Sequence, residues 1–233
     1  MTEQKTIANL ILASLPPKSY QRVHRQLELV SLEFRHVLYE PGKPIRHVYF
    51  PNDCLISLLT SVDKRRTLEV GMVGNEGMAG MPFILGVGVS GVRALVQGEG
   101  TALRMAAAPF RIEFARNRPL QEALYRYTYA LMAQISQTAA CNRFHDAEQR
   151  LARWLLMTRD RVGSDEFSLT HVFLAHMLGL RRVGVTHAAS ALKQRKLINY
   201  RRGTIQILDV KRLEAASCCC YQLVQTVFER ARS

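Results

Sequence analysis

Two spacings of apolar residues alternate along this chain. In residues 5–30, on both sides of Pro16-Pro17, apolar residues recur every three or four positions, as they do in a helix. Between about 33 and 106, short apolar runs alternate with Pro-Gly, Pro-Asn-Asp, charged and Gly-rich turns, which is typical of strands. These runs are 37–39, 47–50, 55–59, 67–70 and 94–97. They predict an antiparallel β-barrel or jelly roll, and the helical spacing returns after Pro109.

The longest predicted helix is free of Gly and Pro from Leu120 to Asn142. Its apolar stripe consists of Leu120, Leu124, Tyr127, Leu131 and Ile135. Such a stripe either covers the barrel or pairs with the same helix of a second chain as a short coiled-coil seam. The segments that follow favour the second use, so we predict a central dimerisation helix over 119–143.

Local signals then predict a pair of short helices. Asp146 and Gln149 have the spacing of a capping box, Gly163 ends the helix they begin, and Thr170 is a candidate N-cap. Gly179 permits a turn, after which a second helix begins near Arg181. Two helices joined by a short turn containing Gly predict a helix-turn-helix.

The second helix of this pair separates apolar from polar positions. At 100° per residue, Val185, Ala188 and Leu192 share the inward side. The opposite side carries Arg182, Val183, Thr186, His187, Ser190 and Lys193. Arginine can bond guanine, Thr and Val can touch a thymine methyl, and His or Ser can bond base edges. We therefore predict that this face reads the major groove of double-stranded DNA, with Lys193 on a phosphate.

A basic hairpin follows the second helix. Residues 197–200 and 204–208 predict two strands around Arg201-Arg202-Gly203, which places the two arginines at the tip of a wing that grips phosphate. The competing interpretation is a charged, solvated helix packed on a hairpin without any role in nucleic-acid binding.

Charge supports the DNA interpretation. Lys and Arg number 32 against 19 Asp and Glu, for a net charge of +13. Nine of the basic residues but only one acid, Asp209, lie between Arg181 and Arg212. Arg181 and Arg182 occupy the helix end at which the dipole disfavours cations, so an external anion is expected there. The segment lacks a carboxylate pair to hold a catalytic metal, and we predict that the chain is not an enzyme.

The five cysteines form neither a disulfide framework nor a CxxC motif. Cys54 and Cys141 are isolated, and Cys218, Cys219 and Cys220 would point in three directions on a helix. We expect no metal, haem or iron–sulfur cluster. The thiols indicate a reducing, cytoplasmic location, and the apolar run Ile7–Leu15 is too short to span a membrane.

The chain resembles the Crp/Fnr family of bacterial transcription regulators over nearly its whole length. FLAHMLGLRRVGVTHAASALKQRKLINYRRGTIQILD resembles the winged helix-turn-helix of that family, and YEPGKPIRHVYFP, LEVGMVGNEGMAG and VRALVQGEGTALRM resemble its cyclic-nucleotide-binding-like roll. The resemblance implies an effector domain over 1–118, a dimerisation helix over 119–143 and a DNA-binding domain over 144–233. It places Arg182, Val183 and His187 at the main base-reading positions.

The resemblance also identifies effector-pocket candidates. Gly74-Asn75-Glu76-Gly77 is similar to the segment that holds a ribose, and Ser136 matches a base-contacting position. Arg93 lies one position later than the arginine that holds a cyclic phosphate, a slip that turns a strand residue to the other face. Glu76, Arg93 and Ser136 thus form a degenerate site, and the signal is unknown.

These observations predict an α+β protein with an N-terminal antiparallel β jelly roll, a long central dimerisation helix and a C-terminal winged helix-turn-helix. The predicted function is a homodimeric transcription regulator that reads a palindromic operator through the helix beginning near Arg181. The alternative is a constitutive DNA-binding protein whose roll is a protein-interaction platform without a small-molecule ligand. RNA polymerase is a candidate partner, although no segment of the sequence marks a surface for it.

Overall fold

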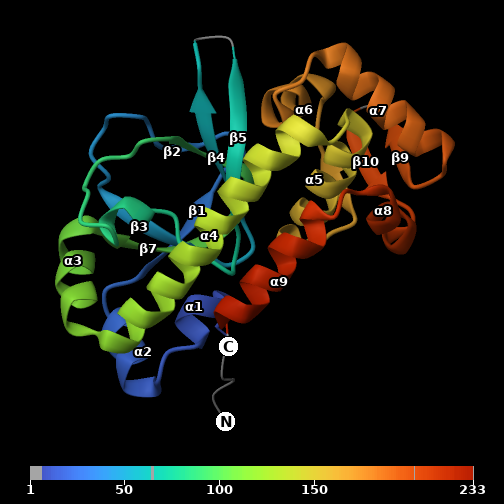
Figure 1. Ribbon diagram of the computed structural model, residues 1–233. Helices are drawn as coiled ribbons and strands as arrows, with labels where there is room; N and C mark the ends of the chain where they lie inside the picture. The colour runs from blue at the N-terminus through green and yellow to red at the C-terminus, as the bar shows by residue number, and fades with distance from the viewer. Residues whose placement is uncertain (1–6, 64–65, 202, 233) are drawn as a thin grey trace. The chain divides into compact units, whose positions relative to one another are not determined.

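The computed structural model describes residues 7–63, 66–201 and 203–232 (Figure 1). The chain divides into two compact units. The first contains the residues up to Leu58 together with Met72–Tyr129, and the second contains Leu59–Gly71 and Ala130–Ala231. Each unit is described separately below.

Two short helices open the described chain. They are α1 (Leu10–Ala13) and α2 (Pro17–His24). Asn9 caps α1 by accepting a hydrogen bond from the Leu12 backbone N–H, and Pro17 occupies the first helical position of α2, where proline loses no hydrogen bond. The helical prediction for residues 5–30 is wrong beyond Arg25. Residues Glu28–Leu32 form strand β1, because pairing with a strand far along the chain overrides the local apolar spacing.

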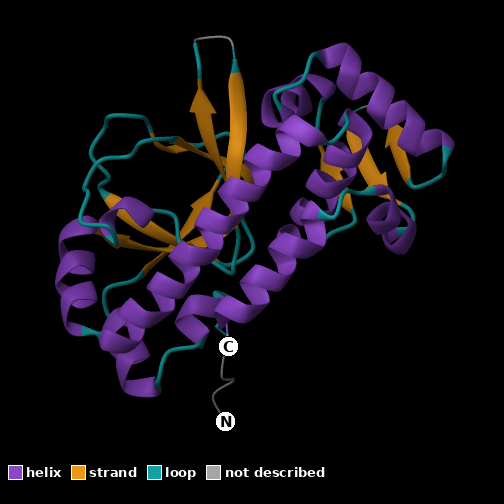
Figure 2. Cartoon of the chain, in the orientation of Figure 1, coloured by secondary structure: helices purple, strands orange, loops and turns teal. Residues whose placement is uncertain are grey.

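Two antiparallel sheets form a roll (Figure 2). Their strands, besides β1, are β2 (Val37–Tyr39), β3 (His47–Pro51), β4 (Leu55–Ser61), β5 (Thr67–Val73), β6 (Arg93–Gly98) and β7 (Gly100–Ala106). These strands belong mostly to the first unit, whereas β5 and the end of β4 fall largely within Leu59–Gly71 of the second. The strand orders are β1-β7-β3 and β2-β6-β4-β5. Val48, Phe50, Ile56, Val96 and Ala102 are fully buried in this roll. The predicted antiparallel roll is confirmed. Strands β1 and β7 belong to it although the apolar runs did not indicate them. The 3₁₀ turn η1 (Met81–Phe83) lies between β5 and β6.

The roll is followed by α3 (Ala107–Arg116) and the long helix α4 (Arg118–Phe144). The stripe predicted for the dimer seam faces the interior of the single chain. Leu120, Leu124 and Leu131 are fully buried, Tyr127 is buried and Ile135 is half-buried. Apolar side chains on another face of α4 are exposed instead, namely Tyr125, Tyr129 and Met132. The first of the two uses considered for the stripe, covering the chain's own core, is therefore the one observed.

The second unit continues from the end of α4. Its elements are α5 (Ala147–Val162), β8 (Glu166–Ser168), α6 (His171–Leu178), α7 (Arg182–Gln194), β9 (Ile198–Arg201), β10 (Thr204–Ile207), α8 (Val210–Ala216) and α9 (Cys220–Arg232). The strands form a sheet in the order β8-β10-β9. The capping box of Asp146 and Gln149 is present, and Gly163 ends α5 in the left-handed conformation. Within the part of the chain that the structure describes, no helix has both the length and the apolar run needed to cross a bilayer.

Candidate nucleic-acid interface

The turn between α6 and α7 is set by local signals. The Thr170 side chain caps α6 by accepting from the Phe173 backbone N–H at 3.2 Å. Gly179 ends the helix at φ 59°, in the left-handed region that favours glycine. Arg181 is the N-cap residue of α7, and its side chain caps no backbone N–H of the described helix. Helix α7 thus begins with uncapped N–H groups and two exposed arginines, Arg181 and Arg182.

Helix α7 is anchored by one apolar face. Val185, Ala188, Ala189 and Leu192 are buried, and α7 packs against both α5 and α6. This confirms the inward side predicted from the sequence and adds Ala189 to it. Burying one face fixes the rotation of α7 about its axis. The side chains of the opposite face therefore point away from the core in defined directions.

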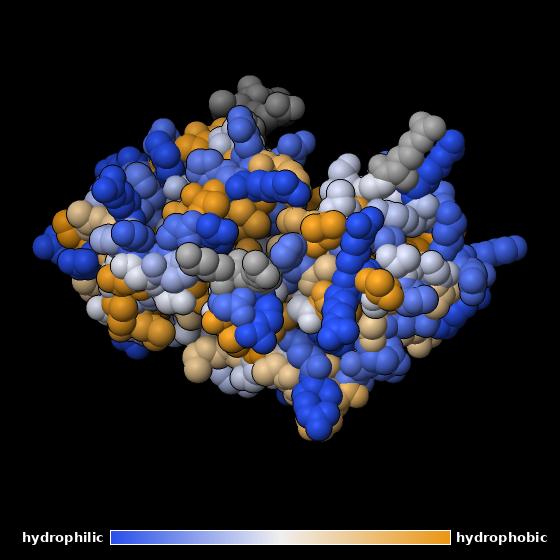
Figure 3. Space-filling model, turned by 90° about the horizontal axis from the view of Figure 1, so that it is seen from above, coloured by the Kyte–Doolittle hydropathy of each residue, from blue (hydrophilic) through white to orange (hydrophobic). Residues whose placement is uncertain are grey.

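The opposite face of α7 is exposed at every predicted position. These positions are Arg182, Val183, Thr186, His187, Ser190 and Lys193. Val183 is an aliphatic side chain at the start of the helix, and it is 65% exposed, so most of its surface is not packed against the described residues. Hydrophilic side chains predominate on the molecular face drawn in Figure 3, with apolar residues in small groups between them. The exposed face of α7 has the same mixed character, which suits the edges of base pairs.

A polar network joins α6, α7 and the wing. The Thr186 hydroxyl donates to the Arg182 backbone carbonyl at 3.0 Å. Its oxygen also lies 3.0 Å from Nδ1 of His171. The His171 ring stacks on Tyr200 of β9, with ring centroids 4.3 Å apart. Burial and the nearby positive charge of Arg182 lower the pKa of His171. No motif or spacing in the sequence marks His171, because only the fold brings it to α7.

The hairpin of β9 and β10 forms the predicted wing. Its register pairs Arg201 with Thr204, and Gly203 takes φ 84° at the turn. Arg201 is exposed, whereas the predicted phosphate contact Arg202 lies outside the described residues. Nζ of Lys193 donates to the Tyr200 carbonyl at 3.0 Å, which ties α7 directly to the wing.

The basic residues of this segment are not equivalent. A guanidinium N–H of Arg195 donates to the Glu148 carboxylate, and its backbone carbonyl accepts from Arg212 at 3.2 Å. Arg195 is therefore engaged in holding α7 to α5 and α8. Arg181, Arg182 and Arg201 carry exposed charge near the exposed face of α7 and the wing, where an external anion can reach them.

The three effector-pocket candidates differ in burial and in hydrogen-bond partners. Arg93 binds Glu40 through Nε and Nη2, the shorter contact being 2.6 Å, and this hydrogen bonding lowers the pKa of Glu40. The Glu76 carboxylate is buried and accepts from the Gly74 N–H at 3.3 Å. Ser136 is exposed on the part of α4 that belongs to the second unit.

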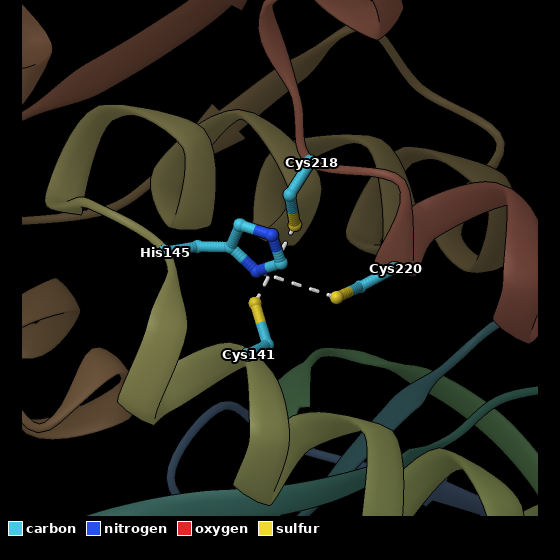
Figure 4. Close-up of side chains that lie close together, drawn as sticks. All are labelled: Cys141, His145, Cys218 and Cys220. Carbon is cyan, nitrogen blue, oxygen red and sulfur yellow. Dashed lines mark hydrogen bonds between the residues drawn. The ribbon is translucent and has the colours of Figure 1, made fainter.

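The structure places the cysteines differently from the expectation based on the sequence. Cys54 is buried in the roll, where burial raises its thiol pKa to about 12. Cys218 and Cys219 precede α9, so the three adjacent cysteines are not spread around one helix. Cys218 and Cys220 instead turn toward Cys141 (Figure 4). Cys219 is exposed.

The geometry of the second unit defines a class of protein. A short turn joins two helices, the second helix has an exposed basic face, and a β-hairpin follows at once. These features together make a winged helix-turn-helix, the arrangement by which many proteins bind DNA.

Comparison with known proteins places the chain within that class. Residues 149–216 match the model of the Crp-like helix-turn-helix domain. A comparison with curated protein sequences returned no match.

Solved structures share the fold over about four fifths of the chain. The c-di-GMP-responsive global regulator CLP of Xanthomonas campestris has a TM-score of 0.69 at 14% identity, over 83% of this chain and 100% of that chain. A Crp-family transcriptional regulator of Thermus thermophilus has a TM-score of 0.67 at 17% identity, over 81% and 96%. FixK2 of Bradyrhizobium japonicum has 0.66 at 13%, over 83% and 98%. Residues 149–216 thus match a Crp-like helix-turn-helix domain, and the chain shares its fold with solved transcription regulators, one of them of the Crp family.

Proposed function

We propose that the chain acts as a homodimer that reads a palindromic DNA operator through helix α7 of each copy. The observation that carries this proposal is the exposed face of α7, on which all six predicted contact residues lie. Two copies related by a two-fold axis would present two such helices to half-sites about one helical turn apart.

Base reading is assigned to the first turns of α7. Arg182 would bond a guanine through two N–H groups, and Val183 would contact a thymine methyl. The Thr186 hydroxyl already donates to the Arg182 carbonyl, so its methyl group is the part free to meet a base. His187 and Ser190 are exposed further along the face and would bond base edges.

Phosphate contacts are assigned to the start of α7 and the wing. Arg181 and Arg201 carry exposed guanidinium groups, and Arg202 is assigned the same role from its place in the sequence. Lys193 uses one N–H on the Tyr200 carbonyl, and an ammonium group has two further donors for a phosphate oxygen. These contacts would set position and orientation without reading sequence.

The dimer seam is assigned to the exposed stripe of α4. Tyr125, Tyr129, Met132, Ser136 and Ala139 are all exposed, and they recur at alternating intervals of four and three residues. This heptad spacing lines one side of a helix and matches the seam of a two-stranded coiled coil. The stripe is separate from the buried leucines that attach α4 to its own chain.

Two uses of the roll are open to a direct test. In the first, the roll binds a signal molecule that raises both the melting temperature and the operator affinity of the chain. In the second, the chain binds DNA constitutively and the roll contacts a protein. The Arg93–Glu40 ion pair favours the second use, because a cyclic phosphate would have to displace a carboxylate already held at 2.6 Å. Thermal shift and DNA binding measured with cyclic AMP and with cyclic di-GMP distinguish the two uses.

The DNA-binding proposal is tested by selecting duplexes from a random library with the purified chain. We expect the selected sequences to share a two-fold-symmetric motif and to bind far more tightly than random DNA at the same salt concentration. Binding to every duplex with equal affinity would contradict the proposal. Footprinting across the genome would then identify the regulated genes and show whether RNA polymerase is bound nearby, in the cytoplasm where the proposed function places the chain.

A further inference from the structure

Four side chains far apart in the sequence converge in the second unit. Cys141 lies on α4, His145 follows the end of that helix, Cys218 precedes α9 and Cys220 begins α9. In Figure 4 the three sulfur atoms and the imidazole point toward one another. One ligand atom from each residue lies within 4.8 Å of every other. The three thiols are buried and His145 is half-buried.

The spacing of these atoms suits a single metal ion. Sγ of Cys141 lies 3.4 Å from Sγ of Cys218, and Sγ of Cys220 lies 3.5 Å from Nδ1 of His145. Tetrahedral sulfur ligands at the usual zinc–sulfur bond length stand about 3.8 Å apart. The ligands of an iron–sulfur cluster stand further apart, because the iron and sulfide atoms lie between them. A disulfide bond needs sulfur atoms about 2.05 Å apart, which the pair Cys141–Cys218 does not have.

The surroundings compensate negative charge. Three thiolates and a divalent ion carry a net charge of −1. Arg150 and Arg153 are 8% and 7% exposed, and Nε of each has no hydrogen-bond partner among the described residues. Two buried guanidinium groups are costly unless an anion lies near them. Arg153 lies close enough to Cys141, and Arg150 close enough to Cys141 and Cys218, for their charges to interact with the cluster.

A hydrogen bond from α4 supports the fourth ligand. Nε2 of Gln137 donates to Sγ of Cys220 at 3.0 Å. A neutral N–H donor on a sulfur atom orients it and stabilises its deprotonated form. The set therefore has its ligands, a charge-compensating environment and an orienting contact, all within one unit of the chain.

We propose that Cys141, His145, Cys218 and Cys220 bind one zinc ion, which joins the end of α4 to the start of α9. Three thiolates and one imidazole are a recognised ligand set for structural zinc, with no open position for catalysis. Binding releases the proton of each thiol that is still protonated and involves no oxidation or reduction. The ion would stabilise the folded second unit, since its ligands come together only on folding.

The first test measures the zinc content of the full chain, purified from cells supplied with zinc, by elemental mass spectrometry. We expect one zinc ion per chain in the wild type and none in Cys218→Ser. Cys219→Ser is the matched control, because this thiol is adjacent in sequence and exposed, and it should keep the ion. A wild type that contains no zinc, or a Cys219→Ser protein that loses it as fully as Cys218→Ser, overturns the proposal.

The second test does not require any variant to fold. Cobalt(II) added to the metal-free wild type should produce the visible absorption of a tetrahedral thiolate site, and zinc should abolish it. Removing zinc with a chelator should lower the temperature at which the fluorescence of Trp154 changes, since the chain has a single tryptophan and it is buried in α5. Absence of the cobalt spectrum, or thiol titration showing a disulfide in the metal-free native chain, contradicts the assignment.

Discussion

Nδ1 of His171 lies 3.0 Å from Oγ1 of Thr186, and this contact connects the two helices of the helix-turn-helix. The Thr186 hydroxyl has one hydrogen, which it donates to the Arg182 carbonyl. The hydrogen in the contact must therefore belong to His171, so its neutral ring is protonated at Nδ1. Nε2 is left buried without a hydrogen-bond partner in the described part of the chain. Adding a second proton would place a charge there, close to Arg182.

This arrangement predicts an acid-sensitive DNA-binding unit. The folded state lowers the pKa of His171 from its ordinary value of 6.5, so between the two pKa values the unfolded chain binds more protons than the folded one. The contribution is complete above about pH 6.5 and is lost progressively as the pH falls from that value through the lower pKa of the folded state. Chemical unfolding followed by Trp154 fluorescence should show a smaller loss of stability between about pH 7 and 5 in His171→Gln than in the wild type. His176→Gln, a change at an exposed histidine on the same helix, controls for loss of an imidazole as such. An unchanged pH dependence in His171→Gln would refute the interpretation.

Arg182→Ala should weaken binding to the selected operator by about 1–3 kcal/mol and relax the preference at one base pair in each half-site. The reason is the loss of a two-bond contact to guanine. Fluorescence anisotropy with the operator and its single-base variants measures both effects. Arg25→Ala, which removes one exposed charge from the first unit, is the matched control and should keep the full base preference. Equal losses on operator and random DNA would show that Arg182 does not read a base.

Arg201→Ala should behave differently from Arg182→Ala. A phosphate contact from the wing contributes to all duplexes alike, so affinity should fall by a similar factor for operator and random DNA. The slope of log affinity against log salt concentration should decrease by about one. Titrations at several salt concentrations measure the slope, and an unchanged slope would exclude a phosphate contact by Arg201.

Tyr129→Arg should convert the chain from dimer to monomer. Tyr129 is 65% exposed within the α4 stripe, and a charge on each copy there would place two cations opposite each other in a coiled-coil seam. Sedimentation equilibrium measures the molecular mass, and affinity for the complete palindrome should fall more than affinity for one half-site. Ile112→Arg makes the same kind of change at an exposed position of α3, 57% exposed, and should remain dimeric. A dimeric Tyr129→Arg protein would place the seam elsewhere.

Gly77→Ala should destabilise the first unit. A Cβ atom at Gly77 would lie 2.4 Å from the ring of Tyr127, and that ring is buried on α4. Relieving the overlap requires a shift of the ring or the loop, which costs about 1–3 kcal/mol. Thermal unfolding measures the change. Gly91→Ala is the control, because a Cβ there meets nothing within 4 Å. Equal melting temperatures for Gly77→Ala and the wild type would show that the Tyr127 ring moves aside without loss of stability.

Local signals explain which parts of the fold could be predicted. The caps at Asp146 and Thr170 and the turn at Gly179 act within a few residues, so each appears in the sequence as a spacing. Strands β1, β7 and β8 were not predicted, because each exists through pairing with a distant partner, as Leu29 does with Leu103. Their own residues alternate too weakly to indicate a strand.

The orientation of α4 and the cysteine cluster could not be predicted from the sequence for a different reason. Helix α4 carries two apolar stripes, one through Leu124 and one through Tyr129, and periodicity cannot tell which one the chain itself covers. In the cluster, Cys141 and Cys218 are 77 residues apart. The Cys141–His145 and Cys218–Cys220 spacings match no common metal motif. Only the packing of α9 beside the end of α4 makes the four residues visible as a set.

The hydrogen bond from Lys193 to the Tyr200 carbonyl links helix α7 to the wing and restrains the spacing between them. In the proposed complex, α7 lies in the groove and the wing lies on the adjacent strand backbone, so this spacing is set before DNA is bound. Adjustment to an imperfect half-site must come from the duplex, whose bending and twisting energies vary with base step. Base pairs that no side chain touches should therefore still influence affinity through their stiffness.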